Sequence, residues 1–278
     1  MAQKHTYAVF GNPIKHSKSP IIHTAFAQQC DLELQYRAVR VELDDFARAA
    51  RNFFDSGGAG LNITVPFKQE AFELADALSD RARRAGAVNT LSPLSGGRLG
   101  GDNTDGIGLV SDMVANLGWV LRDQRVLVLG AGGAVRGILE PVLRERPKEL
   151  LIVNRTAERA QVLAQEFSDL GPVEGGAYSL IGARQFDLVI NGTSAGLAGE
   201  MPDLPSSILT EHSCCYDMVY GAQPTVFMRW AAHHTAWAVA DGLGMLVEQA
   251  AQSFYLWNKM RPETGPVIQQ LRGVLAAA

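Results

Sequence analysis

The chain of 278 residues is 47% hydrophobic and 19% charged, and its formal net charge is −4. These values are ordinary for a soluble globular protein, and the length favours two domains over one. The charge argues against a nucleic-acid-binding protein, because no excess of lysine and arginine is present to displace counterions from a phosphate backbone. We also expect no membrane span and no signal sequence, because no apolar run is long enough for either.

The cysteine and histidine residues bear on the redox compartment and on metal binding. Cys30, Cys214 and Cys215 make an odd number, with two of them adjacent, which favours a reducing compartment such as the cytoplasm over a disulfide framework. His233 and His234 are neighbours, so on a helix they point roughly 100° apart and do not share a metal ion. We therefore predict no metal site.

Short apolar runs alternate with helical patterns along the chain, which predicts an α/β protein with largely parallel sheets. In the first third, the expected strands are 7–11, 34–41 and 59–64, and the expected helices are 19–30 and 44–58. A hairpin is expected around Ser95–Gly97, followed by a helix from about Asp105 to about Gly118.

The same pattern restarts in the second half. The expected strands are 125–130, 149–154, 186–192, 213–220 and 236–241, and the expected helices are 132–145, 156–167, 244–260 and a short one from Pro266. No linker-like stretch separates the halves, so we expect a compact domain border near 105–118.

A glycine cluster follows the strand at 125–130 and opens the next helix. Gly130 permits a tight turn, and Gly132 and Gly133 allow the backbone to approach a pyrophosphate closely at the helix N-terminus. The third glycine of the dinucleotide fingerprint is replaced by Val135. The cluster therefore predicts a dinucleotide site, and the alternative is a glycine-rich turn that binds nothing.

The end of the second strand of this half carries Asn154, Arg155 and Thr156 where an NAD-binding protein usually has an acid. Arg155 and Arg159 are spaced i, i+4, so we expect them to share one helix face. Together with Asn154 they suit a monoester phosphate, which indicates NADP rather than NAD. Thr156 is expected to cap the helix or to contact the phosphate. The alternative is two solvated surface arginines.

The first third contains polar residues that its secondary structure does not need. Ser17 and Ser19 precede Pro20, the expected first residue of a helix. Two hydroxyl groups at a helix N-terminus make a good seat for a carboxylate, although Ser19 is also a simple candidate for the N-cap.

A second polar group ends the buried strand at 59–64. Asn62 and Thr64 point to one face, and Lys68 follows near the carboxyl end of the strand, where ligands bind in open α/β sheets. Asp105 lies in a glycine-bracketed loop. The alternatives are a surface lysine at 68 and a helix cap at 105.

Taken together, these motifs resemble those of the shikimate dehydrogenase family. The resemblance runs from Tyr7 to about Gln270 and rests on GNPIKHSKSP, LNITVPFK, GAVNT, GDNTDG, GAGGA, NRTAER, NGTSAG, YDMVY and ADGLGMLVEQA, which occur in the order and spacing of the family. It implies NADPH-dependent reduction of 3-dehydroshikimate to shikimate, a step of aromatic amino-acid biosynthesis.

The resemblance also implies an architecture of two α/β domains. Residues 1–105 with 242–278 would form a three-layer substrate domain, and residues 106–241 would form a Rossmann-like, doubly wound NADP domain. Substrate ligands carried over by the resemblance are Ser17, Ser19, Asn62, Thr64, Asn89, Tyr220 and Gln249. The cofactor-binding residues carried over are Asp80, Gly130, Ala131, Gly132, Gly133, Ala134, Asn154, Arg155, Thr156, Arg159, Thr193, Met218 and Gly242.

In the reaction that the resemblance implies, Lys68 and Asp105 flank the reacting oxygen as catalytic residues. Burial of Lys68 would favour a neutral amine, whereas a neighbouring carboxylate would favour the ammonium ion, and the sequence does not decide between them. Either Lys68 transfers the proton itself, or it stabilises the alkoxide while Asp105 or water relays the proton. Guided by the family, we hypothesise the first.

Three other functions remain open at this stage. They are a quinate/shikimate dehydrogenase that also accepts NAD, another two-domain NADP enzyme such as a methylene-tetrahydrofolate dehydrogenase, and a dinucleotide-binding sensor without turnover. The expected partner is a small-molecule substrate, with no nucleic acid or membrane, and the chain is expected to be a monomer or a homodimer.

Overall fold

The computed structural model describes residues 5–195, 200–234 and 236–277. The chain divides into two compact units, the first comprising 1–108 and 247–267 and the second 109–246 and 268–278. The predicted border at 105/106 is close to the observed one. The expected return of all residues from 242 to the first domain differs from this division, since 242–246 and 268–278 group with the second unit. In that unit Arg272 pairs with Asp241.

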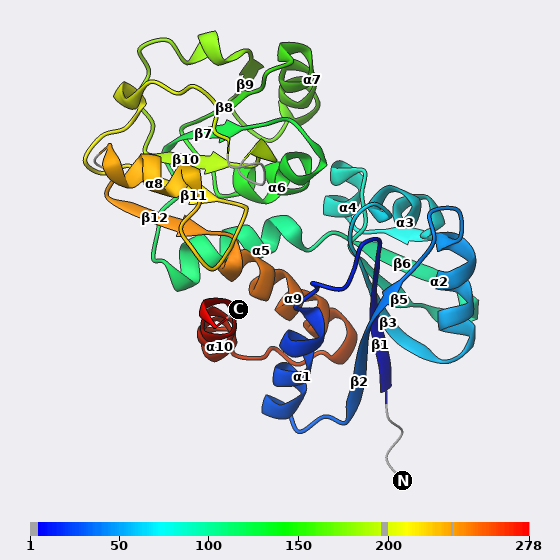
Figure 1. Cartoon of the computed structure of the whole chain (residues 1–278). Helices are drawn as coiled ribbons and strands as arrows, with labels where there is room; N and C mark the ends of the chain where they lie inside the picture. Colours follow the sequence, from blue (N-terminus) through cyan, green and yellow to red (C-terminus); the bar gives the residue numbers. More distant parts are fainter. Residues whose placement is uncertain (1–4, 196–199, 235, 278) are drawn as a thin grey trace. The chain divides into compact units, whose positions relative to one another are not determined.

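The first unit contains a six-stranded sheet in the order β2-β1-β3-β5-β6-β4 (Figure 1). Its strands are β1 (His5–Gly11), β2 (Leu34–Arg40), β3 (Gly58–Ile63), β4 (Ala77–Leu78), β5 (Thr90–Pro93) and β6 (Leu99–Asp102). Strand β1 is parallel to β2 and β3, whereas β5 is antiparallel to both β3 and β6. The predicted hairpin around Ser95–Gly97 is confirmed as the β5–β6 connection.

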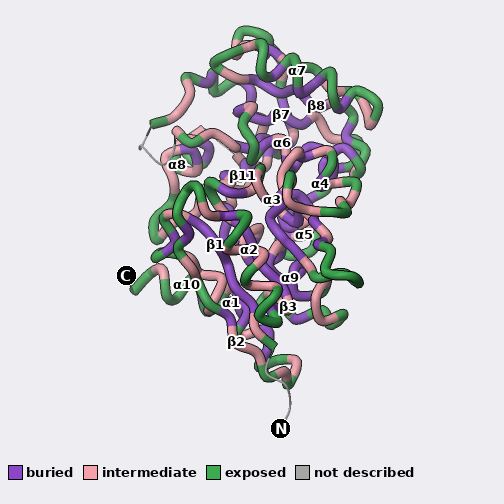
Figure 2. Tube along the Cα trace, turned by 90° about the vertical axis from the view of Figure 1, so that its right-hand side faces the viewer, coloured by how far each residue is buried: buried purple, intermediate pink, exposed green. Residues whose placement is uncertain are grey.

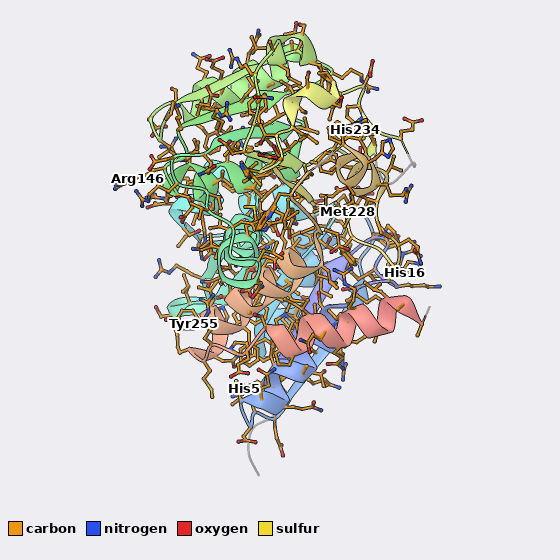
Figure 3. The ribbon with its side chains drawn as sticks, turned by 90° about the vertical axis from the view of Figure 1, so that its left-hand side faces the viewer. His5, His16, Arg146, Met228, His234 and Tyr255 are labelled. Atoms are coloured by element: carbon orange, nitrogen blue, oxygen red, sulfur yellow. The ribbon has the colours of Figure 1, made fainter. Side chains whose placement is uncertain are left out.

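Helices cover both faces of this sheet. They are α1 (Ser19–Gln29), α2 (Phe46–Asp55), α3 (Lys68–Leu74), α4 (Asp80–Ala85), the start of α5 (Asp105–Ser111) and most of α9 (Leu243–Asn258). On one face, Phe46 of α2 and Ala71 of α3 pack with buried residues of β1 and β3. On the other, His23 of α1 stacks on Tyr36 at a centroid distance of 4.2 Å, and Trp257 of α9 packs beside them. Tyr255 is 40% exposed and marks the solvent side of α9 (Figure 3).

The second unit contains a six-stranded, fully parallel sheet in the order β12-β11-β10-β7-β8-β9. Its strands are β7 (Arg125–Leu129), β8 (Glu149–Val153), β9 (Val173–Gly176), β10 (Leu188–Asn191), β11 (Cys214–Asp217) and β12 (Ala238–Asp241). The order reverses between β7 and β10, which is the switch point of a Rossmann-type doubly wound sheet. This confirms the predicted fold class of the second half.

Alternate residues of the central strands enter two separate cores, as the period of a strand requires. Val126 and Val128 of β7 pack with α6 and α7, whereas Leu127 and Leu129 pack in the core that α8 covers. The helices are α6 (Gly133–Arg144), α7 (Ala157–Phe167), α8 (Val226–His233) and α10 (Gly265–Ala276). Strands β3 and β7 are almost wholly buried (Figure 2).

The helix expected from Asp105 to Gly118 has two parts. Helix α5 ends at Ser111, and a π-helical turn continues it over Asp112–Asn116. Among the described residues, no helix is both long enough and apolar enough to cross a lipid bilayer.

Candidate active site

Lys68 and Asp105 form an ion pair in the first unit. Lys68 Nζ lies 2.5 Å from Asp105 Oδ2, and the two side chains are 30% and 16% exposed. Lys68 is the first residue of α3, just after Pro66, and Asp105 is the first residue of α5. Two helix starts thus bring together an ammonium donor and a carboxylate that solvent partly reaches.

Asn89 joins this pair from the start of β5. Because β5 is antiparallel to β6 with Thr90 opposite Asp102, Asn89 lies beside the loop that leads to Asp105. Its amide nitrogen donates to Asp105 Oδ1 at 2.8 Å, so the carboxylate accepts from Lys68 on one oxygen and from Asn89 on the other. The Asp105 backbone N–H donates to Asn103 Oδ1 at 3.1 Å. This arrangement fixes the carboxylate before any ligand binds.

Asn62 is a buried residue that hydrogen-bonds to Asn89. It is 6% exposed, and its amide oxygen accepts from Tyr36 Oη at 2.7 Å. Its amide nitrogen donates to Asn89 O at 3.1 Å and lies 3.0 Å from Ser253 Oγ on α9. Both ends of the amide are therefore occupied, and in this structure Asn62 holds its neighbours in place.

The serine pair lies at the start of α1. The helix begins at Ser19 itself and its N-cap position is Lys18, which corrects the expectation that Ser19 is the cap. The Ser19 backbone N–H donates to Ser17 Oγ at 3.3 Å, so the two residues are adjacent in space. Both are partly exposed, as a carboxylate seat requires.

The remaining predicted residues of the first unit lie in different settings. Thr64 is partly buried just after β3, next to the start of α3. Gln249 of α9 approaches Asn89, with Oε1 at 3.4 Å from Nδ2. Asp80 is exposed in the first turn of α4, and its place in a cofactor site stays a prediction.

In the second unit, the predicted cofactor residues gather at one edge of the sheet. Gly130 follows β7, Asn154 follows β8, Thr193 follows β10, Met218 follows β11 and Gly242 follows β12. All five strands are parallel, so their carboxyl ends share this edge, and ligands of open α/β sheets bind at the switch point there.

The glycine turn at this edge has the geometry that its sequence predicts. Gly130 has a φ angle of +103°, a backbone conformation that residues with a side chain rarely adopt. Its N–H donates to Val153 O at 2.8 Å. Gly132, Gly133 and Ala134 are exposed where α6 begins. The free N–H groups of that helix start, and its partial positive charge, suit a pyrophosphate.

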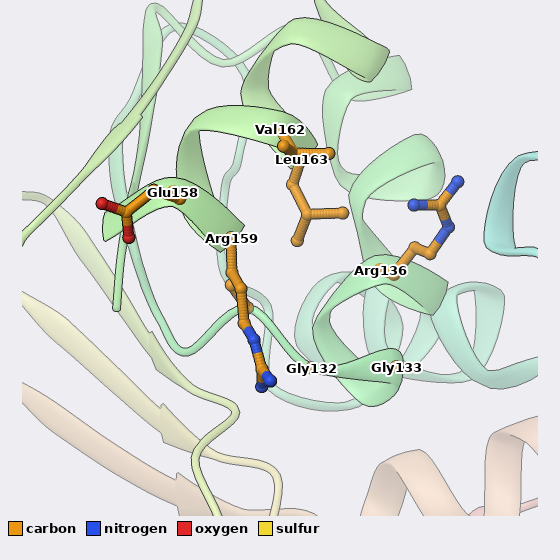
Figure 4. A pocket seen from close by; sticks show the side chains of 8 residues that line it. Gly132, Gly133, Arg136, Glu158, Arg159, Val162 and Leu163 are labelled. Carbon is orange, nitrogen blue, oxygen red and sulfur yellow. The ribbon is translucent and has the colours of Figure 1, made fainter. Parts of the chain in front are cut away.

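A cavity of about 330 Å³ adjoins this turn, lined by Ala131, Gly132, Gly133, Arg136, Glu158, Arg159, Val162 and Leu163. The side chain of Arg159 extends toward Gly132, and Glu158 points away from it (Figure 4). An anion beside the glycine turn would therefore meet the guanidinium group.

The expected helical pairing of the two arginines is wrong. Helix α7 begins at Ala157, so Arg155 lies in the bend before it, and the i, i+4 argument does not apply. Thr156 occupies the N-cap position without a side-chain capping bond, and Asn154 Nδ2 donates to Thr156 O at 2.9 Å. Both arginines are exposed near the end of β8, which leaves the phosphate role of Arg155 and Arg159 a prediction.

A buried polar pair organises the next two loops. Asn191 ends β10 and Asp217 ends β11, and Asn191 Nδ2 donates to Asp217 Oδ1 at 3.1 Å. Thr193 Oγ1 donates to Asn191 Oδ1 at 2.7 Å, which fixes the loop after β10. Burial is the main reason that the pKa of Asp217 is raised above its usual range. The NGTSAG motif runs on to Gly196, which lies outside the described residues.

Tyr220 and Gly242 also belong to the second unit. Burial raises the pKa of the Tyr220 phenol, and the charge of Asp241 raises it further, so the hydroxyl stays protonated near neutral pH. The Gly242 backbone N–H donates to Val219 O at 3.2 Å, which holds the start of α9 beside the loop after β11.

Comparison with known protein families matches most of the chain. Residues 9–91 match the shikimate dehydrogenase substrate binding domain, residues 113–197 match shikimate / quinate 5-dehydrogenase, and residues 242–272 match the shikimate 5'-dehydrogenase C-terminal domain. Shikimate dehydrogenase (NADP(+)) of Cellvibrio japonicus is 58% identical over 96% of both chains. The protein of the same name from Thioalkalivibrio sulfidiphilus is 58% identical over 96% of this chain and 98% of its own.

The chain belongs to the shikimate dehydrogenase family. Among solved structures, shikimate 5-dehydrogenase from Thermus thermophilus, in complex with NADP(H) and shikimate, is 34% identical to it. The two superpose with a TM-score of 0.85 over 98% of this chain and all of the other. The expected resemblance to this family is thus confirmed.

Several residues that shape this member of the shikimate dehydrogenase family escaped the sequence prediction. Thr90 and Thr104 lie inside the quoted motifs GAVNT and GDNTDG, but nothing marks them as partners of Asn89. Ser253 lies one helical turn after Gln249 on α9. That spacing is the sequence feature that could have placed Ser253 near the predicted site. Tyr36 and Asp217 reach their partners only through the fold.

Proposed function

We propose that this chain catalyses the reversible, NADPH-dependent reduction of 3-dehydroshikimate to shikimate. The observation that carries the proposal is the Lys68–Asp105 pair, held at 2.5 Å with Asn89 on the second carboxylate oxygen. A ketone that becomes an alcohol needs a proton at its oxygen, and the Lys68 ammonium is a donor of suitable reach. Membership of the family supports the same reaction.

Lys68 gives its proton to the carbonyl oxygen in reduction and takes one from the hydroxyl in the reverse direction. Asp105 orients the amine through the 2.5 Å contact. Because solvent reaches both side chains in part, the pair exchanges protons with water between turnovers. Asn89 keeps the carboxylate from rotating away from the amine.

The other polar groups are proposed to bind the substrate. Ser17 and Ser19 hold its carboxylate at the start of α1, where the hydroxyl groups are adjacent. Thr64, Gln249 and Tyr220 contact its carboxylate or hydroxyl groups. We assign Asn62 a supporting place beside them, since both ends of its amide are occupied.

The residues at the edge of the second sheet suit NADP(H), which supplies or accepts the hydride when bound. The pyrophosphate would lie against Gly132, Gly133 and Ala134, whose backbone is exposed at the start of α6. Thr193, Met218 and Gly242 follow β10, β11 and β12, which lie in that order outward from the switch point, and they would contact the nicotinamide half.

Selectivity for NADP over NAD is assigned to the end of β8. Arg155 and Arg159 are exposed cations just after β8, and Arg159 lines the cavity beside the glycine turn. No acid stands at the position where an NAD enzyme binds the ribose hydroxyl. Forked, charge-assisted hydrogen bonds to the extra phosphate follow from the chemistry of guanidinium groups. Asn154 and Thr156 complete this end of the site.

The reaction belongs to chorismate and aromatic amino-acid biosynthesis. We propose a cytoplasmic location and a monomer or homodimer.

The test is an initial-rate comparison of the purified chain with shikimate and with quinate, each with NADP⁺ and with NAD⁺. We expect NADPH formation with shikimate. We expect kcat/KM to be at least about tenfold lower with NAD⁺, which lacks the extra phosphate, and with quinate, whose additional ring hydroxyl has no partner in a site that fits shikimate. Equal turnover of quinate with NAD⁺ would favour the broader dehydrogenase. Binding of NADP⁺ without turnover of either substrate would reject the proposal that this chain is a dehydrogenase.

A further inference from the structure

The side-chain amide of Asn89 has one chemically sensible orientation. Its nitrogen donates to Asp105 Oδ1 at 2.8 Å and to Thr104 Oγ1 at 2.9 Å, which uses both hydrogens. Its oxygen accepts from the Thr104 backbone N–H at 3.0 Å. A flipped amide would place its oxygen against the Asp105 carboxylate and its NH₂ against that N–H, so acceptors would face acceptors and donors would face donors.

Thr90 supplies the shortest contact to the amide oxygen. Its hydroxyl donates to Asn89 Oδ1 at 2.8 Å, and the residue has no exposed surface. The hydroxyl oxygen of Thr90 also lies 3.2 Å from Asn62 Nδ2 and 2.8 Å from Ser253 Oγ. Asn62 Nδ2 offers only hydrogens and Asn89 Oδ1 offers only lone pairs, so Thr90 accepts from the first and donates its one hydrogen to the second. In that arrangement Ser253 Oγ is the donor in its contact with Thr90.

We propose that Thr90 is a positioning residue for the reaction: its buried hydroxyl locks the Asn89 amide so that the NH₂ group faces Asp105. The Asp105 carboxylate is then held on both sides, by Asn89 and by Lys68. This inference rests on the proposed function, because the pair it positions is the proposed proton-transfer centre. Thr90 itself makes no contact with Lys68 or Asp105 among the contacts described for it, and so acts through Asn89.

The first test compares Thr90→Val, which keeps the shape and removes the hydroxyl, with Thr90→Ser, which keeps the hydroxyl. With shikimate and NADP⁺, we expect kcat to fall about tenfold in Thr90→Val, the effect of one neutral hydrogen bond of roughly 1.4 kcal/mol. We expect both KM values to stay within about twofold, and Thr90→Ser to retain wild-type kcat within about twofold. Equal kcat in all three proteins overturns the proposal.

Ser253→Ala provides the matched control. It removes a hydroxyl group with no exposed surface from the same cluster, but Ser253 does not bond to Asn89 among the contacts described for it. A general loosening of the core would lower kcat in Ser253→Ala as much as in Thr90→Val, and that result counts against a specific lock. Thermal melts of all variants identify loss of stability separately.

A double-mutant comparison tests the route through Asn89. In an Asn89→Ala background the lock has nothing to hold, so Thr90→Val should change kcat no further. If Thr90→Val lowers kcat tenfold in both backgrounds, the hydroxyl acts by another path and the proposal fails.

One readout does not depend on turnover. The Asn89 side-chain NH₂ signals, identified by their loss in Asn89→Ala, should exchange slowly with solvent in wild type and in Thr90→Ser and faster in Thr90→Val. Unchanged exchange in Thr90→Val overturns the lock even if the wild type is active. Faster exchange in a protein that turns over no shikimate would support the lock and reject the proposed function instead.

Discussion

The two units present their functional groups in opposite ways. In the first, Asn89 is 2% exposed and Asn62 is 6% exposed. Asn62 donates to the backbone carbonyl of Asn89, and the Asn89 side chain donates to Asp105, through hydrogen bonds that already exist. In the second, the glycine turn and Arg155 are exposed, and what fixes them is the sheet below rather than polar partners around them. One region is assembled before ligand arrives, and the other presents backbone and charge to solvent.

This difference suits the two tasks. Proton transfer needs an amine and a carboxylate kept at a fixed distance, so the network around Asp105 is placed where water does not loosen it. Binding a long dinucleotide needs N–H groups and cations on an accessible surface, and a strand–turn–helix supplies them without side-chain partners. Substitutions in the first region should therefore lower kcat, and those in the second should weaken binding.

Asp105→Asn tests the first half of that contrast. The change removes the charge that pairs with Lys68 and places an NH₂ group where either Lys68 or Asn89 donates. We expect kcat with shikimate and NADP⁺ to fall by about 10²-fold, the usual contribution of a positioned acid–base group. Asp123→Asn, at an exposed turn of the second unit, is the control and should behave as wild type. A loss confined to KM would make Asp105 a binding residue only.

Arg155→Ala tests the second half of that contrast, namely that substitutions in the second unit weaken binding. A charge-assisted contact contributes roughly 1.5–3 kcal/mol, so NADPH should bind about 10- to 150-fold more weakly while NADH changes little. Fluorescence titration of the two nucleotides measures both affinities, and the exposed Arg122 provides a control as Arg122→Ala. If NADPH and NADH weaken equally, the arginine does not read the extra phosphate.

Gly244→Ala tests whether a buried polar residue of the second unit, Asp112, is packed as tightly as the network of the first. A Cβ atom at Gly244 would lie 1.9 Å from Asp112 Oδ1, and Asp112 accepts from the buried Tyr216 hydroxyl at 2.7 Å. We expect a loss of about 1–3 kcal/mol in the free energy of unfolding, typical of overpacking. In the control Gly273→Ala, the added Cβ would meet nothing within 4 Å, and the change should stabilise helix α10 by about 0.5–1 kcal/mol. Equal melting curves for the two variants would show that Asp112 and its neighbours move to accommodate the added methyl group without loss of stability.

The buried side of the first unit also predicts a pH dependence. Burial lowers the pKa of His23 to about 3 from its usual value of 6.5, while Asn62 opposes the shift. Below about pH 6.5 the unfolded chain therefore binds a proton that the folded chain takes up only near pH 3, so the stability from this group is present above 6.5 and is lost as the pH falls.

His23→Phe keeps an aromatic ring beside Tyr36 and removes the titration. The drop in unfolding free energy between pH 7 and pH 5 should be smaller by about 2 kcal/mol than in wild type. His212→Phe, at a side chain that is 82% exposed, should leave the drop unchanged. The same drop in all three proteins would mean that His23 is protonated in the folded state.

The sequence predicted the second unit better than the network of the first. A glycine turn after a buried strand is a local pattern, so Gly130 and its neighbours were identified from spacing alone. Lys68 and Asp105 were candidates from their positions after a buried strand and in a glycine-bracketed loop, and the family motifs supplied their catalytic roles. Their contact depends on two helix starts that are 37 residues apart. Thr90 and Tyr36 gained their partners from sheet register and helix packing, which no short window of sequence records.

The error at Arg155 has a local cause. The NRTAER pattern reads as one continuous helix face, but the chain bends after β8 and α7 begins only at Ala157. Helix starts are set by where backbone N–H groups find partners, and these differ by a few residues from where a pattern begins. Arg155 thus owes its position to the end of a strand and not to a helix.

The measurement that tests the central claim most directly is the effect of Lys68→Met on kcat, made together with the dissociation constant of shikimate. Lys148→Met, at an exposed lysine, serves as the control. If the preassembled pair carries the proton, kcat falls by about 10²-fold or more while shikimate binds with nearly unchanged affinity. A variant that keeps near-normal kcat contradicts the account, because the ammonium group would then have no part in the chemical step.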